Sequence, residues 1–122
     1  ITFYQNLSRP LFVNLLRHAS LIAGNSSAGL LEAPTLRVPT INIGLRQRGR
    51  LAAASVLFTD GSRAELEKAL KLIATEQFAQ LLCDVSNPYG DGNSSEKALD
   101  LIKTVNFGAL LRKAADPLYV QR

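Results

Sequence analysis

The stretch from residue 24 to residue 34 combines residue types that can bind an anion. Gly24-Asn25-Ser26-Ser27-Ala28 follows the short apolar run Leu21–Ala23 and leads into Gly29-Leu30-Leu31, which we expect to begin a helix. Backbone N–H groups at such a turn, with the positive end of the helix dipole, form a site for a phosphate. Glu32 falls about one turn further on, where its carboxylate can accept hydrogen bonds from ribose hydroxyls. The pattern favours a nucleotide or nucleotide-sugar site.

A second group of candidate ligands lies in the glycine-flanked segment that carries Arg46, Arg48 and Arg50. Arginines at every second position are typical of a small anion site, and a solvated loop is the alternative. The net charge of +4, from 14 basic and 10 acidic residues, is too small to indicate a nucleic-acid partner, which needs a basic stripe with interleaved aromatic residues. We therefore expect a small anionic ligand and no nucleic acid.

The residues needed for a serine nucleophile, a P-loop or a zinc site are missing from the sequence. A serine nucleophile needs an acid and a histidine later in the chain, but the single histidine, His18, precedes Ser26. The turn lacks the lysine of a phosphate-binding P-loop. One histidine and one cysteine do not assemble a zinc site, so we expect no metal and no cofactor. We expect His18 to bond a carbonyl or a loop at a helix end, in preference to a catalytic role.

The elements that must position these residues alternate along the chain. We predict strands at residues 1–4, 21–23, 38–43 and 55–58, and helices after Ser8, from Gly29, from a Ser62–Glu65 capping box to Ile73, at 76–82, after a Ser94 cap, and through the tail to about Ala115. This order indicates one α/β unit over residues 1–122 with a mostly parallel sheet and flanking helices. Ligands of such sheets bind beyond the carboxyl ends of the strands, where the Ser26–Ser27 turn and the 44–50 loop would both lie.

The composition indicates the compartment and the completeness that we expect of this protein. The 122 residues are 47% hydrophobic with a single cysteine, which fits a globular domain in the reducing cytoplasm. No apolar run approaches the 18 residues that suggest a membrane span, so we expect no membrane partner. The chain begins at Ile1 and contains no methionine, so we expect a piece of a longer protein.

Taken together, four segments resemble the UDP-N-acetylglucosamine 2-epimerases: Gly24–Pro34, Val38–Gly44, Arg46–Arg50 and Asn87–Asn93. The Gly-Asn-Ser-Ser turn with Arg-Gln-x-Gly-Arg is similar to the hydrolysing, sialic-acid-type branch. The resemblance covers most of residues 1–106. It implies the GT-B architecture, in which two Rossmann-like domains bind a UDP-sugar between them, and places this chain in the C-terminal domain.

The resemblance also implies roles for single residues. Ser26 and Ser27 are similar to the diphosphate ligands, Glu32 to the carboxylate that holds the ribose, and Arg46 to the arginine near the nucleotide. Leu7 resembles a residue whose main chain lines the uracil pocket. The chain departs from the family at Arg37, where glycine is usual and where we expect a different helix cap. It departs again at Leu45, which stands where a polar residue is common.

The family's reaction removes the proton at sugar C2, expels UDP by anti-elimination and adds water to give N-acetylmannosamine. Its acidic catalytic residues lie in the N-terminal domain, so we expect no catalytic residue here and no epimerase activity from this chain alone. Two alternatives stay open: the donor-binding domain of a GT-B glycosyltransferase, and a nucleotide-binding module without catalysis. Sheet edges left without partners in a half-domain also predict a homo-oligomer.

Overall fold

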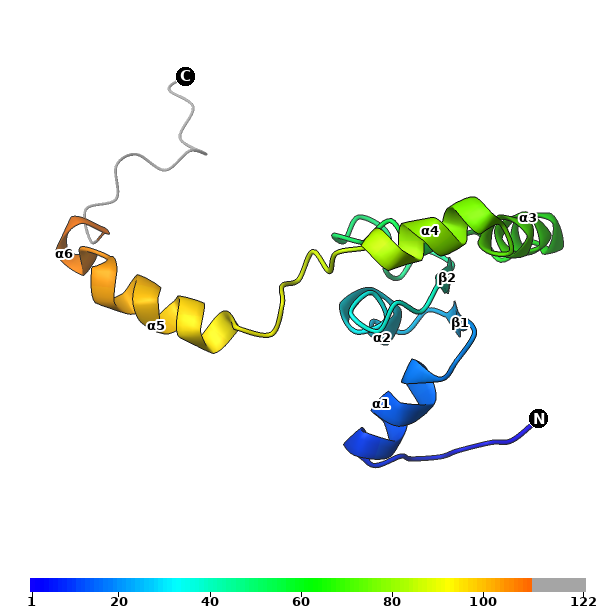
Figure 1. Cartoon of the computed structure of the whole chain (residues 1–122), viewed down its shortest axis with the longest axis horizontal. Coiled ribbons are helices and arrows are strands. Elements are labelled where there is room, and N and C mark those ends of the chain that lie inside the picture. Colours follow the sequence, from blue (N-terminus) through cyan, green and yellow to red (C-terminus); the bar gives the residue numbers. More distant parts are fainter. Residues whose placement is uncertain (111–122) are drawn as a thin grey trace, which may run out of the picture. The chain divides into compact units, whose positions relative to one another are not determined.

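A three-stranded parallel sheet in the order β1-β2-β3 carries the turns singled out by the sequence. Figure 1 labels two of its strands, β1 and β2. Its register pairs Ile22 with Thr40 and Thr40 with Val56. The strands are β1 (Ile22–Gly24), β2 (Thr40–Ile43) and β3 (Val56–Thr59). The structure is a computed structural model that describes residues 1–110. The chain divides into two units, Ile1–Asp91 and the segment from Gly92 onward.

Helices flank this sheet within the first unit. A short helix packs on β1 and β2, and a longer one packs on β3 and on the helix that follows it. The helices are α1 (Arg9–Arg17), α2 (Ala28–Leu31), α3 (Arg63–Ile73) and α4 (Glu76–Asp84). The prediction of an α/β fold with a parallel sheet and flanking helices is confirmed.

Local sequence signals mark where two of the helices begin, a side-chain cap in one and a proline in the first turn of the other. The Oγ of Ser62 accepts a hydrogen bond from the N–H of Glu65 at 3.4 Å, as a capping box requires. The reciprocal bond differs from the prediction, because the N–H of Ser62 donates to the carboxylate of Asp60 at 2.7 Å. Helix α1 begins after Ser8 with Pro10 in its first turn, although the Ser8 side chain makes no capping bond.

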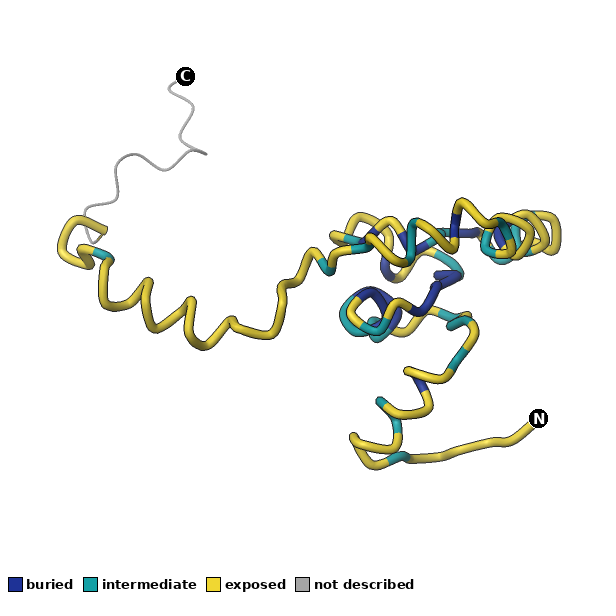
Figure 2. Tube along the Cα trace, viewed as in Figure 1, coloured by how far each residue is buried: buried dark blue, intermediate teal, exposed yellow. Residues whose placement is uncertain are grey.

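The core lies between α2 and the central strand (Figure 2). Leu30 and Ile41 are almost fully buried. The Thr40 hydroxyl donates to the Gly29 carbonyl at 3.1 Å. A Cβ added at Gly29 would lie 2.5 Å from the Cγ2 of Thr40. Glycine is therefore required for α2 to approach β2 this closely.

The loop after α4 ties the far end of the first unit to α2. Asn87 donates from Nδ2 to the Leu31 carbonyl at 2.9 Å and to the Thr35 hydroxyl at 2.7 Å. The Tyr89 hydroxyl donates to the Leu51 carbonyl at 2.9 Å. The segment predicted as a turn thus also anchors residues more than 30 positions earlier in the chain.

The turn that follows α2 ends in a Schellman pattern. The N–H of Arg37 donates to the Pro34 carbonyl at 3.1 Å, and the N–H of Val38 donates to the Ala33 carbonyl at 3.0 Å. Arg37 stands at the position that glycine usually occupies in this motif and has a φ of 57°. The prediction of a different cap is wrong, because the hydrogen bonds hold an arginine in the left-handed conformation.

The predicted strand at residues 1–4 is wrong. The segment has no strand structure, and Ile1, Phe3 and Tyr4 are exposed. A strand needs a neighbour to satisfy its backbone groups, and the sheet of the described residues ends at β1 on one side and at β3 on the other. Apolar composition alone therefore does not form a strand here.

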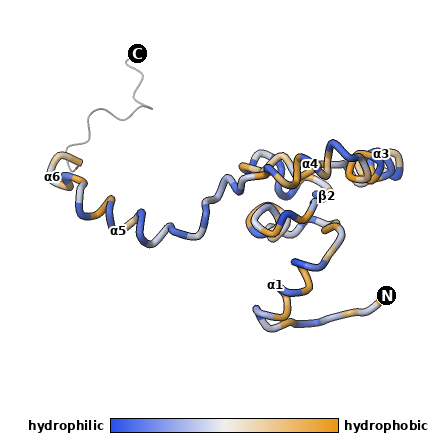
Figure 3. The backbone as a smooth tube through the Cα atoms, in the orientation of Figure 1, coloured by the Kyte–Doolittle hydropathy of each residue, from blue (hydrophilic) through white to orange (hydrophobic). Residues whose placement is uncertain are grey.

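The second unit contains α5 (Ser94–Thr104) and α6 (Phe107–Leu110). The Asn93 carbonyl accepts the first helical bond, from the N–H of Lys97, so Asn93 is the N-cap and the prediction of Ser94 is wrong by one position. Apolar residues recur along α5 (Figure 3), yet Leu99, Leu101 and Ile102 are at least half exposed. The predicted continuation to Ala115 lies outside the described residues. Within residues 1–110, no helix is long and apolar enough to cross a membrane.

Candidate nucleotide-binding site

The turn between β1 and α2 presents backbone and hydroxyl donors. It opens at Gly24, whose φ of 149° favours glycine. The N–H groups of Ser26 and Ser27 have no acceptor among residues 1–110, while the Oγ of Ser26 accepts from the N–H of Ala28 at 3.3 Å. Ser26 is exposed and Ser27 is half-buried. This turn can therefore donate several hydrogen bonds to an anion.

The helix behind this turn is shorter than the sequence suggests. Helix α2 has only four residues, and Glu32 is its C-cap rather than a residue one turn inside it. Pro34 explains the early end, because it has no N–H to donate to the carbonyl of Leu30. One turn carries only a small part of a helix dipole, so an anion would depend mainly on the N–H groups and hydroxyls.

The loop at residues 44–50, here called the arginine loop, follows β2. It contacts the turn that contains Ser26 and Ser27, here called the serine turn. Gln47 is buried, with 2% of its surface exposed. Its Nε2 donates to the Asn25 carbonyl at 3.0 Å. Arg46, next to it, is exposed and has no hydrogen-bond or ion-pair partner in the described part of the chain. Because the carboxyl ends of parallel strands meet at one edge, the predicted convergence of the two loops is confirmed.

Glu32 is held by a residue that the sequence did not single out. The Oε2 of Glu32 is buried and lies 2.6 Å from the guanidinium of Arg9. The pair has ion-pair distance without the angles of a hydrogen bond. Arg9 also lies over the ring of Phe12, 5.8 Å from its centroid. Leu7 is half-buried and precedes Arg9 by two residues.

No hydrogen bond or ion pair within residues 1–110 joins any two of the predicted ligands directly. They are connected through intermediates: Asn25 and Gln47 link the serine turn to the Arg46 loop, and Arg9 fixes Glu32. The Arg-Gln-x-Gly-Arg segment contains Gln47, but only the burial of its side chain in the structure distinguishes it from its exposed neighbours. Arg9 gave no local signal, because its partner is 23 positions away.

Positive charge extends from this loop toward β3. A cavity of about 290 Å³ is lined by Arg48, Gly49, Arg50 and Phe58. Asp60 lies nearby, and its pKa is lowered chiefly by the backbone N–H and the side chain of Ser62, with a smaller contribution from the charge of Arg48. The loop therefore retains a positive field beside one ionised, exposed carboxylate.

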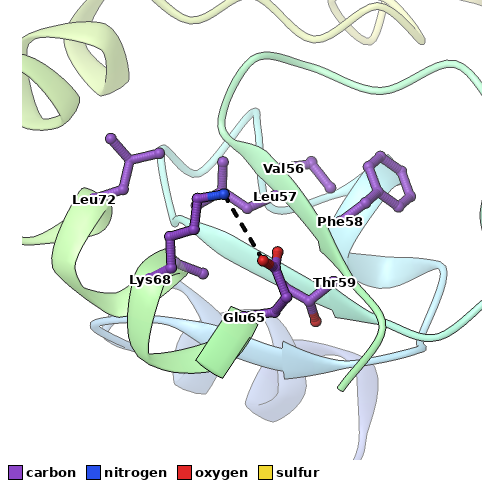
Figure 4. Close-up of a pocket in the computed structure, with 8 residues that line it drawn as sticks. Val56, Leu57, Phe58, Thr59, Glu65, Lys68 and Leu72 are labelled. Carbon is purple, nitrogen blue, oxygen red and sulfur yellow. Dashed lines mark ion pairs between the residues drawn. The ribbon is translucent and has the colours of Figure 1, made fainter. Parts of the chain in front are cut away.

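A different cavity, of about 240 Å³, lies between β3 and α3 (Figure 4). Its walls are mostly apolar, and Glu65 and Lys68 form an ion pair at 3.8 Å along it. None of the predicted ligands lines it. This cavity is separate from the serine turn, and the lysine in its lining is paired with the carboxylate of Glu65.

Metal ligands do not gather in the described residues, where no group of three or more His, Cys, Asp or Glu side chains could hold an ion. His18 caps the end of α1 and hydrogen-bonds the Asn14 carbonyl through Nδ1 at 2.8 Å. The predicted structural role of His18 is confirmed.

A parallel sheet flanked by helices, with polar turns at the carboxyl ends of adjacent strands, defines a Rossmann-like α/β domain. Residues 1–103 match the family model described as UDP-N-acetylglucosamine 2-epimerase. The chain therefore belongs to the UDP-N-acetylglucosamine 2-epimerase family.

Individual relatives support the same family. The chain is 35% identical to polysialic acid biosynthesis protein P7 of Escherichia coli over 83 residues, which are 68% of this chain and 21% of that protein. It is 34% identical to the GDP/UDP-N,N'-diacetylbacillosamine 2-epimerase (hydrolyzing) of Campylobacter jejuni over 77 residues, 63% of this chain and 20% of that protein. A UDP-N-acetylglucosamine 2-epimerase of Neisseria meningitidis is 49% identical over 49 residues, 40% of this chain and 13% of that protein. The matches span about a fifth of the length of the first two relatives.

Proposed function

We propose that this chain is the UDP-binding part of a hydrolysing UDP-N-acetylglucosamine 2-epimerase, within the C-terminal domain of a two-domain GT-B enzyme. The observation that carries the proposal is the serine turn. Its free N–H groups and hydroxyls lie at the carboxyl ends of the strands, beside the arginine loop that contains Arg46. The names of the relatives supply the substrate class, a nucleotide-linked N-acetylated sugar. Membership of the family makes the epimerase a better assignment than the glycosyltransferase or the module without catalysis.

In this proposal the chain holds the nucleotide while another domain performs the proton transfers. Ser26 and Ser27 bind the diphosphate, and Arg46 supplies a positive charge free of any intramolecular ion pair among residues 1–110. Departure of UDP from sugar C1 places additional negative charge on the diphosphate, and fixed donors stabilise that charge without reorganising. Water then adds to the glycal and releases the free sugar. The chain alone binds UDP and has no epimerase activity.

Glu32 holds the ribose in this assignment. The ion pair with Arg9 buries Oε2 and thereby leaves Oε1 as the acceptor for the ribose hydroxyls. The side chain is only 24% exposed, which limits its rotamers before the ligand arrives. A carboxylate held in advance loses less conformational entropy on binding than a mobile one.

Calorimetric titration with UDP tests the proposal. Hydrogen bonds to charged groups contribute about 1.5–3 kcal/mol each, so Glu32→Ala weakens UDP binding about 10- to 100-fold, and Ser26→Ala about tenfold. Glu67→Ala is the matched control for Glu32, because Glu67 also pairs with an arginine, Arg63, at 2.7 Å but lies on α3. Ser20→Ala, at an exposed serine outside the turn, is the control for Ser26. Equal affinities for all four variants would overturn the assignment of the site.

We also propose that the chain self-associates in the cytoplasm, to which its single cysteine is suited. β1 and β3 are the edges of the sheet formed by the described residues, and unpaired edges template association. Sedimentation velocity at increasing concentration would detect a dimer or larger species. A monomer at every concentration would contradict this part of the proposal.

A further inference from the structure

We propose that Gln47 is a positioning residue of the nucleotide site, which fixes the peptide group between Asn25 and Ser26 so that the Ser26 N–H faces the diphosphate. This inference rests on the proposed UDP-binding function and assigns a role to a side chain that touches no ligand in that proposal. It starts from the burial of Gln47, only 2% exposed in a loop whose neighbours Arg46 and Arg48 are exposed. Burying a carboxamide is costly unless both of its ends are paired.

Both ends of the Gln47 carboxamide are paired with groups of opposite hydrogen-bonding character. Arg50 donates from Nη1 to Oε1 at 2.8 Å, and Nε2 donates to the Asn25 carbonyl at 3.0 Å. A guanidinium can only donate and a carbonyl can only accept, so this pair of neighbours fixes which end of the amide faces which partner. Glutamine fits this position because it is an acceptor at one end and a donor at the other. Glutamate has the same shape but lacks the donor.

The peptide plane carries the effect to the proposed ligand. The carbonyl of Asn25 and the N–H of Ser26 belong to one planar, trans peptide group and point in opposite directions. Holding the carbonyl toward Gln47 therefore directs the N–H of Ser26 away from the protein amide, and that N–H has no acceptor among residues 1–110. A hydrogen bond accepted by the carbonyl also polarises the peptide and strengthens its N–H as a donor.

The alternative is that Gln47 only contributes to the general stability of the fold. A purely structural role affects every ligand of the site alike, whereas a role in aiming the Ser26 N–H affects only ligands that carry phosphate. Uridine and UDP share the base and ribose and differ in the diphosphate. The ratio of their affinities therefore separates positioning from general stability.

The test titrates UDP and uridine into the wild-type chain and into Gln47→Glu, Arg50→Ala and Arg48→Ala. We expect Gln47→Glu to weaken UDP binding about tenfold or more, the effect of one charge-assisted hydrogen bond, while uridine binding changes less than about twofold. Arg50→Ala removes the hydrogen-bond donor to Oε1 of Gln47. Because Arg50 is exposed, we expect this variant to fold. Arg48→Ala removes an equal charge from the same loop, but the Arg48 side chain makes no hydrogen bond to Gln47 in the described residues. We expect a smaller loss of UDP affinity in Arg48→Ala, and this loss measures the contribution of the charge. Arg50→Lys, which can still donate to Oε1, restores part of the UDP affinity.

A double variant separates positioning from direct contact. If Arg50 acts through Gln47, then Arg50→Ala causes little further loss in a Gln47→Ala background, because the group that it orients is absent. If Arg50 contacts the diphosphate itself, the two losses add, and that result would overturn the role of Arg50 in orienting Gln47. UDP binding that is lost in Ser26→Ala but unchanged in Gln47→Glu would overturn the positioning role and leave the proposed function intact. No UDP binding by the wild type would overturn the proposed function, and the positioning role with it.

Discussion

Replacing Arg37 with glycine should stabilise the protein. Arg37 has a φ of 57° within the Schellman pattern that closes the turn after α2. A residue with a Cβ loses about 1–2 kcal/mol in the left-handed conformation. Glycine avoids that strain but loses about 0.5–1 kcal/mol more through its freedom in the unfolded chain. The difference predicts a gain of about 0.5–1 kcal/mol in the free energy of unfolding for Arg37→Gly.

Equilibrium unfolding in urea, with thermal melts monitored by circular dichroism, measures this gain. For a domain of this size it corresponds to a rise in Tm of about 3–6 °C. The slope of the denaturation curve should stay constant, since the surface exposed on unfolding does not change. A series of variants isolates the backbone effect: Arg37→Asn, which tolerates the conformation, should fall between glycine and the wild type, and Arg37→Val should be less stable than the wild type.

Arg37→Ala is the control for charge. It keeps the Cβ and therefore the strain, but it removes the guanidinium from an exposed position in a chain with a net charge of +4. We expect Arg37→Ala to remain within about 0.5 kcal/mol of the wild type, as for most surface substitutions. A gain in Arg37→Ala equal to that in Arg37→Gly would refute the backbone argument, since charge would then account for the effect. A loss of stability in Arg37→Gly would refute the strain itself.

Three further predictions concern contacts elsewhere in the first unit. Gly29→Ala should lower the free energy of unfolding by about 1–3 kcal/mol, typical of overpacking, because its Cβ would lie 2.5 Å from the Cγ2 of Thr40. Adding Thr40→Ser, which removes that methyl and keeps the hydroxyl, should recover part of the loss in the same melt, and no recovery would place the strain elsewhere. Asp60 has a lowered pKa because of the N–H of Ser62, so its contribution to stability is present above its ordinary pKa of about 3.9 and is lost as the pH falls through the lowered value. Asp60→Asn should flatten the dependence of Tm on pH over that acidic range, and an unchanged profile would contradict the assignment. Asn87→Ala should lower stability by about 1–2 kcal/mol, since two hydrogen bonds to the α2 region are lost, and amide exchange in α2 should accelerate more than in α4.

Much of the fold follows from signals within a few residues. Apolar runs marked three strands, and the Ser62–Glu65 box marked the start of α3. The alternation of these elements indicated a parallel sheet, and the parallel sheet placed the serine turn and the arginine loop at one edge. Local failures have local causes as well: Pro34 ended α2 after four residues, and Asn93 accepted the first bond of α5 in place of Ser94.

The sequence by itself determined the class of fold, the family and the chemical types of the candidate ligand residues, because helical spacing, turn residues and motif spacing are encoded within short segments. The tertiary structure decided which other residues contact those candidates. The hydrogen bond from Gln47 to Asn25 spans 22 positions, and Arg9 reaches Glu32 across 23. Residues 1–4 are exposed despite their apolar composition, because they pair with neither edge strand of the sheet. Such contacts depend on which strands pair and in what register, and neither is contained in any one segment of the chain.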